Sequence, residues 1–237
     1  MPRPTPPQPK LQTTTLWYHP SQQYGEEPLG TPGYRGATPA YVLWNLLTRY
    51  TREGDLVVDP FCGGGTTLDV ARSLGRRALG YDVRPAREDV FRADARKLPL
   101  EDGKADFVFM DPPYSTHVEY SGRPDCIGEL SAFDEAYFAA MGEAFAEAWR
   151  TLRDRRYLAV LAGDSFVKKR GFVPIGARFS GMLGARFRPV DHVAVVRGNR
   201  NLEKPRFHKA AAEGNFFLRG FQHLLIFKKE LPRERQR

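Results

Sequence analysis

The sequence predicts an α/β fold, a doubly wound and mostly parallel sheet of seven strands. Two observations predict it. An apolar strand at 56–59 runs into residues 59–67 (DPFCGGGTT), so a strand, a glycine turn and a helix start follow one another. A second apolar strand at 107–110 ends in residues 111–114 (DPPY), whose two prolines continue neither a helix nor a sheet ladder.

Each of the two turns lies at the carboxyl end of its strand, which is where open α/β sheets bind ligands. Glycines allow a ligand to approach the backbone closely, and the helix start offers unpaired N–H groups. Alone, the glycine turn could serve packing and the DPPY stretch could be a rigid turn. Together in one sheet they indicate a binding site.

Length and composition predict one main domain. A chain of 237 residues with 41% hydrophobic residues can bury a substantial core. We expect a flexible, proline-rich arm at 1–15, a single domain at 16–230 and a charged tail at 231–237. Two inserted loops are expected at 115–130 and 197–215, where long loops at a ligand-binding edge commonly form lids or substrate contacts.

Composition also predicts a soluble, cytoplasmic protein. Two cysteines do not make a disulfide framework, which favours a reducing compartment. The N-terminus has no apolar region typical of a signal peptide, and no apolar run is long enough to span a bilayer. No Cys/His spacing indicates a metal site.

The charge is distributed unevenly along the chain. Residues 1–150 carry 16 Lys and Arg against 21 Asp and Glu, whereas residues 151–237 carry 20 against 7. A basic half of this kind is typical of a protein that binds a polyanion, although charge also serves solubility. We therefore expect nucleic acid to bind through the basic residues of 151–237, with an affinity that falls steeply with salt.

The other elements follow from capping signals and apolar periodicity. Thr38 is the expected cap of a helix that has Pro39 at its first position and runs to about Arg52. The apolar stripe of a helix at 133–153 indicates core packing. Further helices are expected at 66–74 and 174–183, and further strands at 77–82, 157–162, 190–196 and 216–229, with a short strand before Asp94.

At its two motifs the sequence resembles the S-adenosylmethionine-dependent N6-adenine and N4-cytosine DNA methyltransferases. Their cofactor motif reads DPFxGxGTT and their catalytic motif reads [DNS]PP[YFW], and both occur here in full. The resemblance extends from about Thr38 to the end of the sheet. It implies the Rossmann-like fold of class I methyltransferases, with S-adenosylmethionine as the cofactor.

The resemblance also implies the site residues. An acid about twenty residues after the glycines, here Asp82, can accept hydrogen bonds from ribose hydroxyls, and Asp94 is expected near the adenine amino group. A solvated loop acid is the alternative for both, as a plain helix cap is for Thr38. The expected cofactor-binding residues are Thr38, Asp59, Phe61, Gly63, Gly65, Thr66, Asp82 and Asp94, and the expected catalytic residues are Asp111, Pro112, Pro113 and Tyr114.

The implied reaction is a direct in-line methyl transfer to an exocyclic amine of a base in DNA. Asp111 and the Pro112 carbonyl would each accept one N–H of that amine, and Tyr114 would stack on a base flipped from the duplex. No metal and no covalent enzyme intermediate is required. Neither Cys62 nor Cys126 follows a proline, as the nucleophile of C5-type enzymes does, so both are expected to be inert.

Several alternatives stay open. Asp111, at the first position of the catalytic motif, favours adenine as the target base. Cytosine in DNA, or N2 of guanine in tRNA, fits the same motif. Many enzymes with these motifs place the catalytic one first, whereas here it comes second, and no separate recognition domain is evident. Recognition would then depend on 115–130, 165–173 and 197–215, with His117 as a substrate contact or a plain loop residue. A non-catalytic protein of the same fold, one that only binds nucleic acid or a partner, is a further alternative. The motifs do not specify the target sequence, a nuclease partner or the oligomeric state, for which a homodimer is one alternative.

Overall fold

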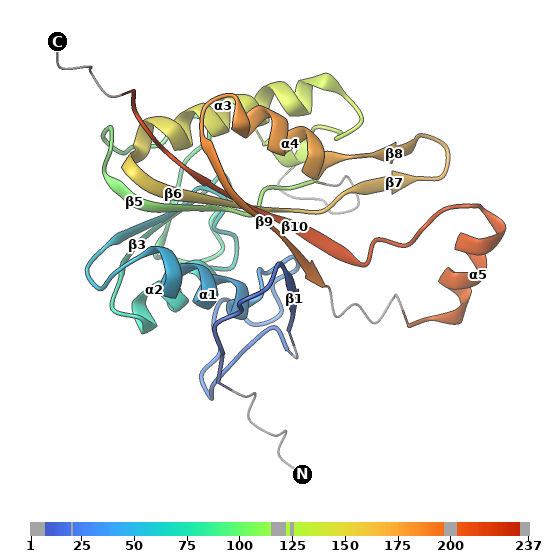
Figure 1. Ribbon diagram of the computed structural model, residues 1–237, viewed down its shortest axis with the longest axis horizontal. Helices are drawn as coiled ribbons and strands as arrows, with labels where there is room; N and C mark the ends of the chain where they lie inside the picture. Colours follow the sequence, from blue (N-terminus) through green and yellow to red (C-terminus); the bar gives the residue numbers. More distant parts are fainter. Residues whose placement is uncertain (1–7, 20, 115–121, 124–125, 197–202, 233–237) are drawn as a thin grey trace.

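The computed structural model describes residues 8–19, 21–114, 122–123, 126–196 and 203–232. A central sheet lies between two layers of helices, with α1 and α2 on one face and α3 and α4 on the other (Figure 1). The helices are α1 (Ala40–Tyr50), α2 (Thr66–Ser73), α3 (Glu135–Thr151), α4 (Ile175–Gly184) and α5 (Pro205–Glu213), with a 3₁₀ turn at Ile127–Glu129. None of the helices in these described ranges is long and apolar enough to cross a bilayer.

The main sheet has eight strands, in the order β1-β9-β10-β6-β5-β2-β3-β4. Among them β10 alone runs antiparallel to its neighbours, and the other pairs are parallel. The strands are β1 (Leu16–Tyr18), β2 (Leu56–Asp59), β3 (Arg77–Asp82), β4 (Val90–Arg92), β5 (Ala105–Met110), β6 (Leu152–Ala162), β9 (Arg188–Val196) and β10 (Phe221–Lys228). The predicted α/β, mostly parallel sheet is therefore confirmed.

The eighth strand is the correction to that prediction. Strand β1 pairs in parallel with β9, with Leu16 opposite Ala194, at the edge of the sheet. The central residue of β1, Trp17, is buried, and its indole N–H donates to the Thr14 carbonyl at 2.8 Å. A three-residue strand carries no recognisable periodicity of its own, so it forms because the edge of β9 is available.

Two stretches expected to be loops contain regular structure. Within 165–173, β7 (Ser165–Val167) and β8 (Gly171–Val173) form an antiparallel hairpin. Within 197–215, helix α5 occupies 205–213, and residues 197–202 lie outside the described part of the chain. Residues 115–121 and 124–125 of the other expected loop, which include His117, also lie outside it. Of the expected N-terminal arm, residues 1–7 are not described, and the Gln12 N–H donates to Asn45 Oδ1 at 2.7 Å.

The core consists of two apolar layers separated by the sheet. All six residues of β5 are buried, because helices cover both faces of this central strand. Val108 packs in the layer beneath α3 and α4, whereas Phe107 and Phe109 pack in the layer beneath α1. The two adjacent strands β2 and β5 are therefore held rigidly from both sides.

The glycine turn after β2 packs closely on the neighbouring strand β3. The Cys62 N–H donates to the Tyr81 carbonyl at 3.0 Å. A Cβ added to Gly80 would lie 2.3 Å from Cys62 Sγ and 3.2 Å from Leu68 Cδ1. Gly80 is therefore required by the close approach of the turn, and Cys62 is a buried packing residue whose pKa is raised by burial.

We expect Gly80→Ala to lower the free energy of unfolding by about 1–3 kcal/mol, the usual cost of overpacking a core. Urea unfolding followed by circular dichroism measures it. Gly181→Ala is the matched control, because open space surrounds that glycine in α4, and it should stabilise the protein by about 0.5–1 kcal/mol. Equal effects of the two substitutions would contradict this account of the turn.

Candidate active site

The two sequence motifs meet where the strand order of the sheet reverses. From β2 the chain continues outward to β3 and β4, then returns to β5 on the other side of β2 and proceeds to β6. The carboxyl ends of β2 and β5 therefore flank the switch point of a doubly wound sheet, the usual ligand site of this architecture. A cleft of about 1670 Å³ opens there, larger than the roughly 300–1,000 Å³ of a pocket for one small ligand.

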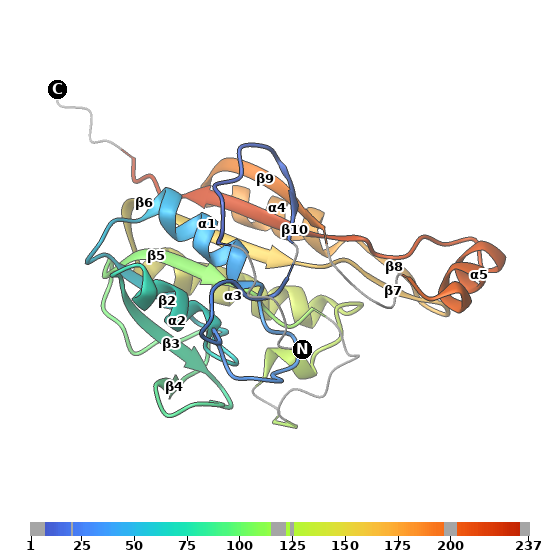
Figure 2. The ribbon, with the colours of Figure 1, turned by 90° about the horizontal axis from the view of Figure 1, so that it is seen from below.

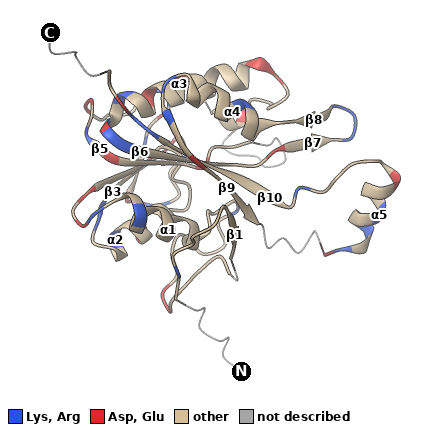
Figure 3. Ribbon diagram, in the orientation of Figure 1, with Lys and Arg blue, Asp and Glu red and all other residues tan. Residues whose placement is uncertain are grey.

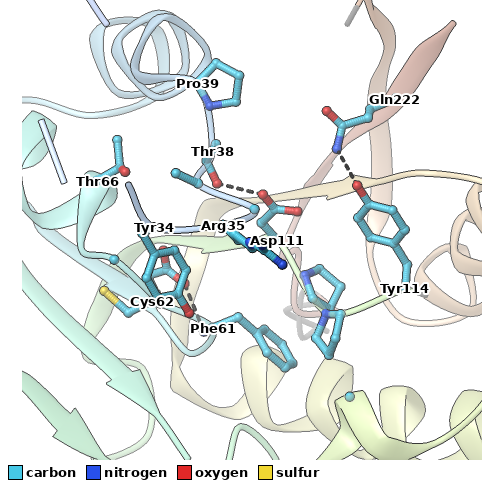
Figure 4. A pocket seen from close by; sticks show the side chains of 18 of the residues that line it. Tyr34, Arg35, Thr38, Pro39, Phe61, Cys62, Thr66, Asp111, Tyr114 and Gln222 are labelled. Atoms are coloured by element: carbon cyan, nitrogen blue, oxygen red, sulfur yellow. Dashed lines mark hydrogen bonds between the residues drawn. The ribbon is translucent and has the colours of Figure 1, made fainter. Parts of the chain in front are cut away.

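The cleft brings together nearly all the predicted site residues, and Figure 4 labels Thr38, Phe61, Thr66, Asp111 and Tyr114 among them. Its lining includes Thr38, Asp59, Phe61, Gly63, Thr66, Asp82, Asp94, Asp111, Pro112, Pro113 and Tyr114. Gly65 does not line it. That glycine has a φ of 81° at the start of α2, and a Cβ there would lie 2.6 Å from Arg87 Nη1. A glycine is needed here because the backbone has a positive φ and passes directly beneath the Arg87 side chain.

The glycine turn is covered by an N-terminal segment that the sequence did not single out. The Thr31 N–H donates to the Gly64 carbonyl at 2.7 Å, and the Gly30 N–H donates to Asp69 Oδ2 at 2.7 Å. A Cβ on Gly63 or Gly64 would lie 2.9 or 2.8 Å from the side chain of Tyr34. The ring of Tyr34 thus lies directly on the turn, and any bulkier residue in the turn would displace it.

The carboxylate of Asp82 joins the end of β3 to the glycine turn. Its Oδ2 accepts the Gly63 N–H at 3.0 Å, and its Oδ1 accepts the Arg84 N–H at 2.8 Å. Burial raises the pKa of Asp82, while both backbone hydrogen bonds lower it. Since each carboxylate oxygen has two lone pairs, this fixed group can still accept hydrogen bonds from the hydroxyls of a ligand.

Asp94 lies in the cleft but is tied to its own turn. Its carboxylate forms an ion pair with Arg96 at 2.6 Å, and its Oδ1 accepts the Arg96 N–H at 2.9 Å. At this end of the cleft the charge of Asp94 is therefore already paired with that of Arg96.

Asp59 is the deepest acid of the cleft. Its Oδ1 accepts the Phe61 N–H at 2.9 Å and its Oδ2 accepts the Thr67 hydroxyl at 2.5 Å. Burial raises the pKa of Asp59 to about 7, against these hydrogen bonds and with smaller contributions from the charges of Asp111 and Asp82. A cationic group placed nearby would stabilise the ionised form of this carboxyl.

Asp111 is held from across the cleft by Thr38. The Thr38 hydroxyl donates to Asp111 Oδ2 at 2.7 Å, as Figure 4 shows. The prediction that Thr38 caps helix α1 is wrong: the helix begins at Ala40, Pro39 occupies the cap position, and no side chain caps it. The hydroxyl instead donates to a carboxylate, and such a charge-assisted hydrogen bond is stronger than one between neutral groups.

The rest of the DPPY stretch is fixed by α3 and β10. The Tyr137 hydroxyl donates to the Pro113 carbonyl at 2.7 Å. The Tyr114 hydroxyl accepts the side-chain amide of buried Gln222 at 3.2 Å, and a Cβ on Gly163 would lie 2.8 Å from the Tyr114 ring. The tyrosine ring therefore has a set position beside Asp111 in the cleft.

A chain of titratable groups lies at the neighbouring strand ends. Asp164, which follows β6, accepts from His223 Nε2 at 3.0 Å, and His223 Nδ1 lies 2.9 Å from His192 Nε2. Burial would raise the pKa of Asp164, but the bonds from His223 and the Gly176 N–H hold it below its usual value. Sequence reasoning missed these residues, as it missed Tyr34 and Gln222, because no local pattern distinguishes them.

Comparison with known sequences agrees with the first of the two motifs. The family described as DNA methylase, with N6 and N4 members, matches residues 6–92, a range that contains the glycine turn and stops before Asp111. The type II methyltransferase M2.DpnII of Streptococcus pneumoniae is 40% identical over 63 residues, 27% of this chain and 22% of that protein. The resemblance predicted from the motifs is thereby confirmed.

A second relative is a tRNA (guanine(10)-N2)-dimethyltransferase of Methanothermobacter thermautotrophicus. It is 33% identical over 113 residues, which are 41% of this chain and 33% of that protein. The chain thus spans a third or less of the length of both relatives.

Solved structures confirm the fold. A SAM-dependent methyltransferase from Methanosarcina mazei superposes with a TM-score of 0.51 at 14% identity, covering 79% of this chain and 98% of that one. TrmN from Thermus thermophilus gives 0.54 at 20% identity, covering 82% and 50%. At these identities the likeness concerns the architecture of the chain.

The pKa of Asp59 predicts a difference in the pH dependence of stability between the native sequence and Asp59→Asn. The pKa of this carboxyl is about 3.9 in the unfolded state and about 7 in the native state. Between these two pH values the native state holds a proton that the unfolded state has lost. This contribution to stability is complete below pH 4 and lost as the pH rises through 7. Urea titrations from pH 4 to 8 should show Asp59→Asn gaining stability over the native sequence across this window. A difference independent of pH would contradict the raised pKa.

Proposed function

We propose that this chain transfers a methyl group from S-adenosylmethionine to an exocyclic amine of a base in DNA, N6 of adenine or N4 of cytosine. The observation that carries the proposal is the placement of Asp111. One of its oxygens is fixed by Thr38, in the same cleft as the glycine turn and Asp82. We propose that the same carboxylate accepts an N–H of the substrate amine.

The residues at the end of β2 suit S-adenosylmethionine. Asp82 offers a fixed carboxylate for ribose hydroxyls, and Asp59 favours a nearby cation. We propose Asp59, Phe61, Gly63, Thr66, Asp82 and Asp94 as the residues that line the cofactor. When bound, S-adenosylmethionine supplies an electrophilic methyl group on a sulfonium ion.

The residues at the end of β5 suit the acceptor amine. Such an amine is a weak nucleophile, because its lone pair is delocalised into the ring. Asp111 and the Pro112 carbonyl each accept one N–H, which favours a lone pair localised on nitrogen and directed at the methyl group. Tyr114, held by Gln222, provides a face for the base to stack on. After the transfer, one proton leaves the amine toward Asp111 and water.

The type II methyltransferases among the relatives favour DNA as the polymer. One observation favours RNA: the longer match is to an enzyme named for N2 of guanine in tRNA. The same acceptor geometry serves both substrates. We propose DNA as the main substrate and tRNA as the alternative, bound in either case through the basic residues of 151–237.

Labelled methyl transfer tests the proposal. The protein is incubated with labelled S-adenosylmethionine and either unmodified DNA or unmodified tRNA, and nucleosides are identified by mass spectrometry. We expect N6-methyladenine or N4-methylcytosine in DNA. N2-methylguanine found in tRNA alone would show that tRNA is the substrate and would contradict the assignment to DNA. Cofactor binding without any transfer would contradict the enzymatic function.

Asp111→Ala should lower the rate of methyl transfer by about 10²–10³-fold, as expected when a preorganised hydrogen-bonding group is lost. Cofactor affinity, measured by calorimetry, should change little, because the acid faces the acceptor. Thr38→Val should cause a smaller loss of the same kind, and Thr38→Ser should restore the rate. Asp102→Ala, at an exposed acid that bonds Arg150, is the matched control. Normal transfer by Asp111→Ala would refute the assignment.

A further inference from the structure

The β7–β8 hairpin and the segment 203–220 form one projection, here called the arm, beside the cleft. Both extend from the carboxyl edge of the sheet in the same direction, in two perpendicular views (Figures 1 and 2). The ring of Phe166 in the hairpin stacks on that of Phe216 at 4.6 Å, with 17° between the planes. Arg219 lies 5.0 Å from the centre of the Phe172 ring. These contacts join the two pieces into one unit.

The arm carries a surplus of positive charge. The hairpin stretch 165–173 contains Lys168, Lys169 and Arg170 and no acid, and 203–220 contains four Lys and Arg against two Glu. Lys and Arg mark the turn of the hairpin, and basic residues also lie along α5 (Figure 3). A projection with this charge, at the rim of the proposed catalytic cleft, is complementary to a phosphate backbone.

An unburied phenylalanine lies at the base of the arm. Phe217 is 86% exposed, the highest value among the large apolar side chains of the described chain. Its neighbours Phe216, Leu218 and Arg219 all line the cleft. Phe217 precedes Gln222, which holds Tyr114, by five residues, and a stretch of that length spans at most about 18 Å.

The backbone that carries Phe217 is held in place. The Phe216 N–H donates to the Ala211 carbonyl at 3.0 Å, and the Arg219 guanidinium donates to the carbonyl of Phe217 itself. Arg219 in turn lies over Phe172, as described above. The exposed ring is therefore presented by an ordered loop, and its exposure is not the result of a loose chain end.

We propose that Phe217 inserts between the bases of duplex DNA and occupies the space vacated when the target base flips into the cleft. This inference rests on the proposed function. Proteins that distort DNA commonly insert an apolar wedge of this kind between base steps, and an enzyme that modifies a base within a duplex extrudes that base first. The arm binds the phosphates, Phe217 fills the gap, and Tyr114 and Asp111 receive the base.

The test compares Phe217→Ala with the native sequence on unmethylated genomic DNA, either native or heat-denatured. A single-stranded base needs no extrusion. The rate on duplex DNA should therefore fall by at least about tenfold, while the rate on denatured DNA stays within about twofold. Phe217→Trp should retain the duplex rate, because a larger ring still fills the gap. Phe91→Ala removes a ring that is 52% exposed on β4 and is the matched control, with no effect on either substrate.

The outcomes separate the wedge from the proposed function. Transfer by the native sequence to both DNAs, with Phe217→Ala unchanged on both, overturns the wedge and leaves the methyltransferase. An equal loss on duplex and denatured DNA also overturns it, since that result indicates a general role in binding or folding. Absence of transfer by the native sequence to either DNA overturns the proposed function, and the wedge with it.

Discussion

The parallel pairing of β2 with β5 is the constraint on which the rest of the site depends. Val57 lies opposite Phe107 and Val58 opposite Val108, so the two strands end within one residue of each other. The glycine turn and the DPPY stretch come directly after these ends, and a one-residue slip would reverse the faces of every side chain in one strand. Burial on both faces fixes this register. The Thr38–Asp111 hydrogen bond then links the segment before α1 to the end of β5.

The cleft is electrostatically unusual because five acids line it, Asp59, Asp82, Asp94, Asp111 and Asp164, and three of these lie around the two motifs. Asp59, Asp82 and Asp111 are spread over the ends of three adjacent strands, and burial and mutual repulsion raise the pKa of Asp59. Such a site favours a ligand with positive charge and hydrogen-bond donors. A sulfonium compound with ribose hydroxyls has both properties, whereas a nucleotide phosphate at the same turn would meet these acids. The acids therefore favour a sulfonium compound as the ligand of this cleft, a choice that a glycine turn alone does not make.

Much of the fold follows from local sequence. The strands at 56–59 and 77–82 have the predicted bounds, because each of them ends at an acid, Asp59 or Asp82. Helix α5 was missed because Ala211 is its only buried residue, so it lacks an apolar stripe. Strand β1 was missed because its partner, β9, lies about 175 residues away. The same limit applies to the site: Asp111 and Asp82 stand out in motifs, but the contact of Thr38 with Asp111 and that of Gln222 with Tyr114 join residues distant in sequence.

A crystal structure with bound S-adenosylhomocysteine and a short DNA duplex would test the central claim most directly. We expect the ribose hydroxyls to bond to Asp82 and the sulfur to lie between Phe61 and Asp111. We expect the flipped base to stack on Tyr114 and its amine to donate to Asp111, while the Thr38 hydroxyl keeps its bond to the other oxygen of that carboxylate. A cofactor bound away from the glycine turn, or an Asp111 directed away from the amine, would contradict it.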